Sequence, residues 1–217
     1  MFTGIIRDLG RVARIEKCGE NEKNAENGLL LHISTRLPAM HFERGASIAV
    51  DGVCLTVEEF EGVADGSEGT NLGGIFQVTA VAETLDKSRI SDYVEGSEVN
   101  LEPPLTLQDA VAGHLVLGHV DCVAEIVAEA PDLQLKVPAE LGRLLPRKGS
   151  VTVNGVSLTI AELLDSASEK CTVIRIAIIP ETMRATNLGD AKSGDLVNIE
   201  IDMVARYLDQ LNSSSNS

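Results

Sequence analysis

The 217-residue sequence predicts an all-β fold of two similar domains, followed by a C-terminal α-helix. The first observation is an internal repeat: four short landmarks recur in one order with roughly one hundred residues between partners, the length of one small domain. The second is the pattern of turn-forming residues, which separate short apolar segments and indicate a closed barrel or a sandwich in each half. A closed barrel is favoured because it leaves no exposed sheet edge.

The repeated landmarks define the expected domains. Those at residues 37–39, 51–57, 83–85 and 96–102 match residues 137–139, 154–160, 181–183 and 194–200. Each half is long enough to form a separate core. The sequence therefore predicts a first domain at residues 1–102, a second at 103–200, and a C-terminal segment at 201–217.

One stretch, residues 112–121 (AGHLVLGHVD), opens the second copy. It aligns with the start of the chain so that Gly118 coincides with Gly4. His119 then stands where the first copy has Ile5. The duplication is therefore asymmetric at a position suited to chemistry.

The first half begins with strand-like segments. They lie at residues 2–6 and 10–15, 29–33, 47–59, 75–82 and 97–102, with a polar hairpin loop at 18–28 and an exposed hairpin tip at 61–74. Pro38 predicts the start of a short helix that ends before residue 45. The proline pair at 103–104 ends the domain, since proline cannot sustain a strand ladder. Thr106, with Asp109 three residues later, predicts a short turn of helix in the linker.

The landmark at residues 51–57 has two distinct faces if its side chains alternate. One face holds Asp51, Val53, Leu55 and Val57, and the other holds Gly52, Cys54 and Thr56. The second copy repeats this with Val156, Leu158 and Ile160 against Gly155, Ser157 and Thr159. The aliphatic face predicts a core. The small, weakly polar face is either solvent surface or the site of a planar ligand, and its recurrence favours the ligand.

The second half repeats these elements, with a short helix near residues 138–145 and a basic turn at 147–149. Asp202 is a candidate N-cap for a C-terminal helix. Its apolar stripe consists of Val204, Tyr207, Leu208 and Leu211. Because a helix of about ten residues is marginal alone, this stripe must pack on its own domain or on the same helix in other subunits. Residues 213–217 are expected to be disordered.

The composition excludes several classes of partner. A net charge of −15 opposes binding to nucleic acid or to a membrane, because both require a basic patch. Four Phe, two Tyr and no Trp mean that a flat ligand would lie against aliphatic side chains. The four cysteines form no Cys-x-x-Cys pair, which favours reduced thiols. Without a signal-like segment or a long apolar run, a soluble cytoplasmic protein is expected.

The sequence offers little support for metal chemistry. His114 and His119 are five residues apart, so no regular strand or helix lets both bind one ion, and His119 with Asp121 lacks a third ligand. Cys54 has no base on its own strand, which favours a packed thiol over a nucleophile. No metal site is therefore expected. The sequence also contains no Gly-x-Gly-x-x-Gly or Walker motif, so no dinucleotide-binding or phosphate-binding loop is expected.

Five motifs together resemble the riboflavin synthase alpha chain family. They are residues 1–5 (MFTGI), 51–56 (DGVCLT), 113–121 (GHLVLGHVD), 155–159 (GVSLT) and 179–182 (IPET). The resemblance extends from Met1 to about Leu211. It implies two six-stranded Greek-key barrels, a C-terminal helix that gathers three chains, and active sites between the first barrel of one subunit and the second barrel of another. It also implies lumazine synthase as a candidate partner.

The family's activity is a transferase reaction that completes riboflavin biosynthesis. A four-carbon unit moves from one 6,7-dimethyl-8-ribityllumazine to another, which gives riboflavin and 5-amino-6-(ribitylamino)pyrimidinedione. Two homologous but divergent pockets suit this dismutation, because they hold two copies of one substrate in unequal roles. No external cofactor is implied, since the electron-poor lumazine ring stabilises the carbanion at its own methyl group.

The resemblance also implies two sets of site residues. The first pocket would use Gly4, Ile5, Ile6, Ser47, Val53, Cys54, Leu55, Ala82, Glu83 and Thr84. The second would use Gly118, His119, Val120, Lys148, Ser157, Leu158, Thr159, Ile179, Pro180, Glu181 and Thr182. In the implied mechanism, Ser47 and Cys54 assist addition at the acceptor ring. His119, Ser157 and Thr159 position and polarise the other lumazine or relay its protons.

The sequence departs from the family pattern at several positions. Residues 86–91 (DKSRIS) replace the Arg-x-Thr-Asn-Leu-Gly that residues 184–189 keep, Asn154 replaces Asp, Ala112 replaces Gly, and Pro103-Pro104 replaces Arg-Ala. An alternative function is binding of lumazine or flavin without turnover, as in antenna-type lumazine proteins. Those proteins lose parts of the 112–121 motif that this chain keeps. A third is an assembly module without affinity for ribityl compounds.

Overall fold

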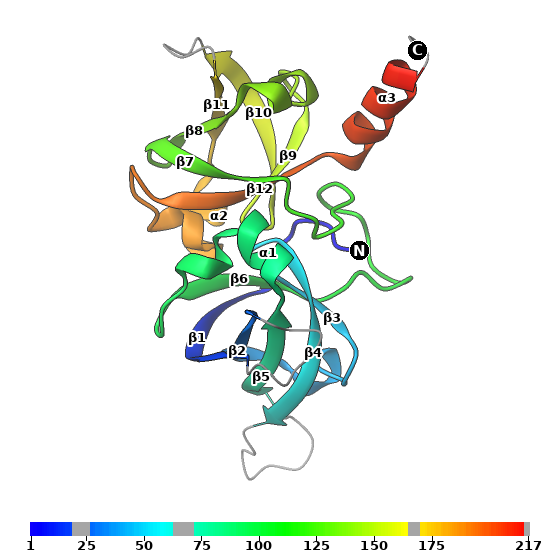
Figure 1. Cartoon of the computed structure of the whole chain (residues 1–217), viewed down its shortest axis with the longest axis vertical. Helices are drawn as coiled ribbons and strands as arrows, with labels where there is room; N and C mark the ends of the chain where they lie inside the picture. Colours follow the sequence, from blue (N-terminus) through cyan, green and yellow to red (C-terminus); the bar gives the residue numbers. More distant parts are fainter. Residues whose placement is uncertain (19–26, 63–71, 165–169, 215–217) are drawn as a thin grey trace.

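Two closed antiparallel β-barrels follow one another along the chain (Figure 1). The computed structural model describes residues 1–18, 27–62, 72–164 and 170–214. The first barrel contains β1 (Asp8–Lys17), β2 (Leu29–Pro38), β3 (Ser47–Val50), β4 (Val53–Gly62), β5 (Leu72–Ala80) and β6 (Glu98–Glu102). The second contains β7 (Cys122–Ala128), β8 (Asp132–Pro138), β9 (Ser150–Val153), β10 (Val156–Leu164), β11 (Cys171–Ala177) and β12 (Leu196–Ile201).

The strand order is the same in both barrels. It is β1-β2-β5-β4-β3-β6 in the first and β7-β8-β11-β10-β9-β12 in the second. Neighbouring strands pair in antiparallel register throughout, for example Cys54 opposite Ala49 and Ser157 opposite Thr152. The predicted fold class, two similar six-stranded Greek-key barrels, is therefore confirmed.

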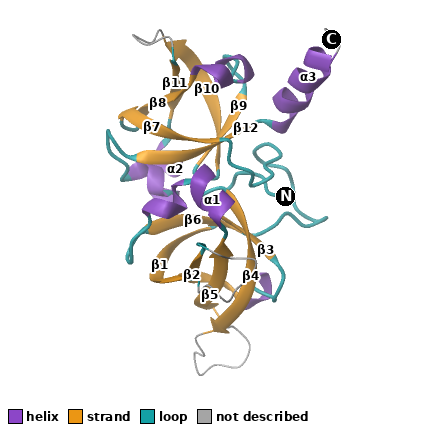
Figure 2. Ribbon diagram, in the orientation of Figure 1, coloured by secondary structure: helices purple, strands orange, loops and turns teal. Residues whose placement is uncertain are grey.

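Short helices connect the strands (Figure 2). They are η1 (Ala39–His41), α1 (Ala82–Lys87), η2 (Arg89–Asp92), η3 (Ala139–Leu144), α2 (Pro180–Ala185) and η4 (Asn187–Gly189). The C-terminal helix α3 (Met203–Ser214) follows the last strand. The helices expected after β2 and β8 form as the 3₁₀ turns η1 and η3. The sequence did not predict α1 and α2, because six residues are too few to establish a helical period.

Two predicted strands differ from the structure. The segment expected at 47–59 is divided into β3 and β4, because Asp51 and Gly52 adopt positive φ angles of 45° and 79° and form a tight turn. Residues 2–6 form only one bridge, in which Phe2 and Val116 exchange backbone hydrogen bonds of 2.7 and 3.0 Å. The predicted linker helix is instead a turn whose Thr106 donates two hydrogen bonds to the Asp109 carboxylate.

Each barrel buries its own apolar core, as the alternation of residues 51–57 predicts. The side chains of Val53, Leu55 and Val57 are buried, whereas Thr56 is exposed. At one end of the first core, Phe42 stacks on Phe76 with ring centroids 4.8 Å apart. The second barrel has an equivalent core of its own.

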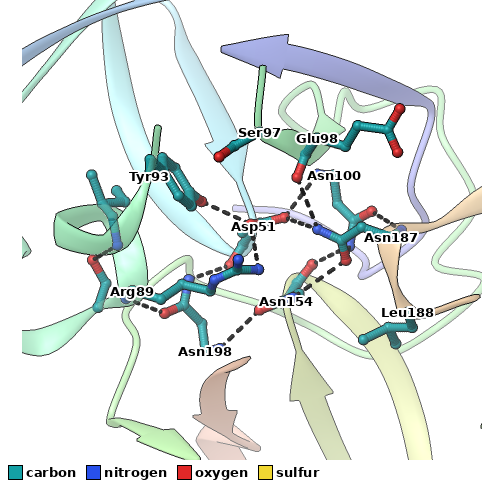
Figure 3. A network of polar contacts seen from close by, with 12 residues as sticks. Asp51, Arg89, Tyr93, Ser97, Glu98, Asn100, Asn154, Asn187, Leu188 and Asn198 are labelled. Atoms are coloured by element: carbon teal, nitrogen blue, oxygen red, sulfur yellow. Dashed lines mark hydrogen bonds and ion pairs between the residues drawn. The ribbon is translucent and has the colours of Figure 1, made fainter. Parts of the chain in front are cut away.

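Polar side chains join the two barrels (Figure 3). The Asp51 side chain is fully buried in the first barrel and accepts a 2.8 Å hydrogen bond from Asn187 of the second. Asn100 and Asn198 occupy equivalent positions on β6 and β12. The Asn100 amide donates to the Asn154 carbonyl at 2.8 Å, and the Asn198 amide donates to the Asp51 carbonyl at 2.9 Å. This inter-barrel network holds the two halves in one arrangement.

The C-terminal helix α3 extends away from the second barrel (Figure 1). Two ion pairs anchor it, Arg206 with Asp121 at 2.8 Å and Arg143 with Asp209 at 2.9 Å. The predicted apolar stripe of the helix is exposed at all four positions: Val204, Tyr207, Leu208 and Leu211. Packing of the stripe on its own domain is therefore wrong for this chain.

Some predictions fall on residues outside the described ranges. These are most of the loop at 18–28, most of the hairpin tip at 61–74, and the end of the tail at 215–217. The predicted disorder is wrong at residues 213 and 214, because α3 continues to Ser214. None of the helices in the described part of the chain is both long and apolar enough to cross a membrane.

Candidate functional site

The strands that carry Cys54 and Ser157 are each covered by a segment from the opposite half of the chain. The backbone N–H of Cys54 donates to the carbonyl of Gly118 at 2.9 Å. The backbone N–H of Ser157 donates to the carbonyl of Gly4 at 2.8 Å. Each small, weakly polar strand face is therefore bordered by a backbone segment of the other repeat.

Glycine is required where these segments approach the strands. Gly118 has a φ of +81°, and a Cβ atom added there would lie 2.5 Å from the Cβ of Cys54. Gly4 has a φ of +76°, and its added Cβ would lie 2.5 Å from the Cβ of Ser157. Both the backbone conformation and the close approach exclude larger residues.

This crossing corrects the predicted division of residues between the pockets. The Gly4 segment lies against Ser157 of the second barrel, and Ile6 packs against the core of that barrel. The Gly118 segment lies against Cys54, and Val120 packs against the core of the first barrel. The two segments are thus exchanged: Gly4, Ile5 and Ile6 belong with the second pocket, and Gly118, His119 and Val120 belong with the first.

The second barrel contains a cavity of about 300 Å³ next to Ser157. It is lined by Lys148, Ser157, Leu158, Thr159, Ala161, Ala177, Ile179 and Thr182. Six of these were predicted for the second pocket, whereas Pro180 and Glu181 do not line the cavity. These two lie exposed in the first turn of α2, where Glu181 pairs with Arg184.

Lys148 enters this cavity from a strained backbone. Its φ is +68°, in the left-handed region that few residues other than glycine occupy. The equivalent position in the first half is Gly45, which has a φ of +89°. Among the described residues Lys148 has no ion-pair partner in the structure. Its ammonium group is thus available to an acceptor in the cavity.

His114 lies behind the second pocket, where it contacts the lining residue Ser157, and the sequence prediction omitted it. Its Nδ1 lies 2.7 Å from the Ser157 hydroxyl, and its Nε2 lies 3.2 Å from the Thr152 hydroxyl. Burial lowers the pKa of His114 below its usual range, which favours the neutral imidazole. A neutral imidazole can accept the Ser157 proton. The sequence signal for His114 is its position in the 112–121 motif. In the sequence analysis His114 is weighed only as a metal ligand.

In the predicted first pocket, three small polar side chains lie on one face of β3 and β4. Ser47 on β3 pairs with Thr56 on β4, and Cys54 shares that face two residues away. Thr56 is the counterpart of Thr159, and the repeat could have identified it. Val53 and Leu55 were predicted as binding residues, but their side chains are buried in the barrel core. Only their backbone atoms can face a ligand.

The remaining predicted residues of the first pocket lie on α1. Ala82 and Glu83 are exposed, whereas Thr84 is half-buried. Their positions match those of Pro180, Glu181 and Thr182 on α2. His119 is exposed and follows Gly118 directly, so it lies at the border of the Cys54 face. The first barrel thus places a thiol beside the segment that bears an exposed imidazole, whereas the second pairs a hydroxyl with a half-buried imidazole.

Comparisons with known proteins show what the chain is similar to. The model of the lumazine binding domain matches residues 3–103 and again residues 117–202. The chain is 41% identical over 216 residues to a riboflavin synthase of Brucella abortus, with 97% of this chain and 98% of the relative covered. It is 37% identical to a riboflavin synthase of Mycobacterium bovis, with the same coverage. A riboflavin synthase of Bacillus subtilis is 35% identical, with 96% of this chain and 88% of the relative covered.

Solved structures show the same fold. The structure of LumP complexed with riboflavin has a TM-score of 0.66 and 21% sequence identity, and covers 93% of this chain and 99% of LumP. LumP complexed with 6,7-dimethyl-8-(1'-D-ribityl) lumazine has a TM-score of 0.64. With the duplicated domain match and the identity over nearly the whole chain, these findings show that the chain belongs to the riboflavin synthase family of duplicated lumazine-binding barrels.

Proposed function

We propose that this chain is a riboflavin synthase, a transferase that acts on two molecules of 6,7-dimethyl-8-ribityllumazine. A four-carbon unit leaves one molecule and joins the other, giving riboflavin and 5-amino-6-(ribitylamino)pyrimidinedione. The two products together contain all atoms of the two substrates, so the reaction needs no external oxidant or reductant. The full-length identity to riboflavin synthases supports this activity.

The observation that carries the proposal is the chemical difference between the two equivalent strand faces that bear Cys54 and Ser157. The Ser157 hydroxyl is paired with the half-buried His114, whereas Cys54 has no such partner among the described residues and lies beside the segment that bears the exposed His119. A dismutation needs this inequality, because one substrate gives up the four-carbon unit and the other accepts it. Holding both rings in fixed positions supplies proximity and orientation.

The residue roles follow from these surroundings. Ser47 and Cys54 assist addition at the ring in the first pocket, together with His119. Ser157 and Thr159 polarise the ring in the second pocket, and His114 moves a proton through the Ser157 hydroxyl.

The assembly is also part of the proposal. We propose that three chains associate through the exposed stripe of α3 and that each active site pairs a first barrel with the second barrel of another subunit. The exposed stripe, Val204, Tyr207, Leu208 and Leu211, supports this arrangement. Lumazine synthase is the expected protein partner and the cytoplasm the expected location. We also propose domain limits at 1–102, 103–200 and 201–217, as the repeat predicts.

Variants of the first pocket test its role. Cys54→Ser and His119→Gln are each expected to lower kcat for riboflavin formation at least tenfold. Removal of a proton-transfer group typically costs about 10²–10⁴. Cys122→Ala is the matched control, because burial raises the pKa of that thiol to about 12 and its side chain packs against the second core. Absorbance assays that place both site variants within twofold of the parent would refute these assignments.

Variants of the second pocket test the His114–Ser157 pair. Ser157→Ala and His114→Gln are each expected to lower kcat by about 10–100-fold. The double variant should be no slower than the slower single variant, because the two groups act as one unit. Since burial lowers the pKa of His114, kcat of the parent should stay level as the pH falls through 6.5, the ordinary histidine value. Additive losses in the double variant would contradict a joint role.

A further inference from the structure

Two buried glutamates occupy equivalent positions on the last strand of each barrel. Glu102 on β6 is 4% exposed, and Glu200 on β12 is 2% exposed. Neither carboxylate forms an ion pair within the described part of the chain. Burial raises the pKa of both carboxyl groups, because it penalises the charged form. Such costly groups need a structural reason.

Glu200 binds three successive backbone N–H groups of the segment that covers the first barrel. Its Oε1 accepts from Leu117 at 2.7 Å, and its Oε2 accepts from Gly118 and His119 at 2.9 Å each. The carbonyl of Gly118 in turn accepts the Cys54 N–H at 2.9 Å. A side chain of the second barrel therefore fixes the backbone beside Cys54.

Glu102 makes the equivalent contacts in the opposite direction. Its Oε1 accepts from the Thr3 N–H at 2.7 Å and the Thr3 hydroxyl at 2.8 Å, and its Oε2 accepts from the Gly4 N–H at 3.0 Å. The Gly4 carbonyl accepts the Ser157 N–H at 2.8 Å. A side chain of the first barrel therefore fixes the backbone beside Ser157.

We propose that Glu200 and Glu102 are positioning residues, each of which sets the substrate pocket of the other barrel from within its own barrel. The nature of the substrate rests on the function proposed above, but the crossed control of the two pockets does not. Neither glutamate touches the reacting atoms. Each acts through the backbone segment that it holds.

A glutamine tests this role because it removes acceptor capacity without much change in size. Its amide has one oxygen, and its NH₂ group would face N–H donors that now bind a carboxylate oxygen. In Glu200→Gln, the single amide oxygen can replace only one carboxylate oxygen, so the segment loses either the bond from Leu117 or the two bonds from Gly118 and His119. In either case the segment beside Cys54 shifts or loosens. Glu102→Gln is the matched control, since it makes the same change at the segment beside Ser157.

The experiment follows alkylation of the Cys54 thiol by iodoacetamide in the full-length protein, quantified by peptide mass spectrometry. Glu200→Gln is expected to change the Cys54 rate at least threefold, whereas Glu102→Gln should leave it within twofold of the parent. Both variants should lower kcat for riboflavin formation by about 10–100-fold, as small misplacements of reacting groups do. The alkylation result does not depend on turnover, so it remains decisive even if the chain makes no riboflavin.

Two outcomes would overturn the proposal. Equal Cys54 rates in the parent and in folded Glu200→Gln would show that Glu200 does not set the first pocket. Equal changes in Glu200→Gln and Glu102→Gln would show a general structural role without crossed control. If Glu200→Gln does not fold, Glu200→Asp gives the same comparison, because it keeps the charge and withdraws the carboxylate by one methylene. Glu102→Asp is then its control.

Discussion

Gly118→Ala is expected to lower kcat for riboflavin formation by about 100-fold, the usual cost of displacing reacting groups by about 1 Å. The added Cβ would lie 2.5 Å from the Cβ of Cys54 and 2.9 Å from its backbone nitrogen. Neither neighbour is the end of a flexible side chain, so the segment or β4 must move. The Gly118 φ of +81° adds about 1 kcal/mol of backbone strain. Steady-state assays and thermal melting measure the two effects.

Gly96→Ala separates the close approach from the backbone strain. Gly96 has a φ of +95°, and an added Cβ would meet nothing within 4 Å. It should therefore lose about 1 kcal/mol of stability from the φ angle alone, with kcat within twofold of the parent. If Gly118→Ala were as active as Gly96→Ala, the segment beside Cys54 would not shape the first pocket.

Arg89→Asn is expected to lower the free energy of unfolding at neutral pH by about 3 kcal/mol, as loss of one partner of a buried ion pair does. Arg89 Nη1 lies 3.4 Å from the Asp51 carboxylate, and it is the cation of the inter-barrel network. Desolvation raises the pKa of Asp51 and Arg89 opposes that rise. Without Arg89 the buried carboxylate keeps only neutral donors, such as Tyr93 and Asn187.

The pH dependence and a second substitution test this explanation. A carboxyl group whose pKa is raised in the folded state loses its stabilising contribution as the pH rises through that pKa, so the deficit of Arg89→Asn should shrink toward acidic pH. The double variant Asp51→Asn/Arg89→Asn should recover most of the loss. The double variant has asparagine at both positions, as the second barrel has at the equivalent Asn154 and Asn187. There the Asn154 amide donates to the Asn187 side-chain oxygen at 3.3 Å. A double variant with the summed losses in urea unfolding would contradict this interpretation.

Local patterns predicted the pocket strands and favoured a closed barrel over a sandwich, and the family resemblance added the six-stranded Greek-key arrangement. The alternation of residues 51–57 and its repeat at 154–160 placed Cys54 and Ser157 on the less buried face, where the structure has them. It did not predict which barrel each covering segment contacts. Gly4 and Gly118 align equally well in both arrangements, and only the packing of Ile6 and Val120 decides between them.

Residues that act through tertiary contacts were also beyond the pattern. His114 lies 43 positions from Ser157 along the chain, so no local pattern pairs them. In the sequence, Glu102 and Glu200 are acidic residues at the ends of two apolar strands. This position does not indicate what their side chains bind. Apart from the Thr3 hydroxyl, the partners described above are backbone N–H groups, which carry no side-chain signature.

The most direct test of the function mixes the purified, metal-free protein with 6,7-dimethyl-8-ribityllumazine alone and follows the absorbance of riboflavin, with the second product quantified by chromatography. Riboflavin and 5-amino-6-(ribitylamino)pyrimidinedione should appear in equal amounts, because each reaction consumes two lumazines. Tight binding of lumazine without any riboflavin would contradict the enzyme assignment and would favour a lumazine-binding protein without turnover.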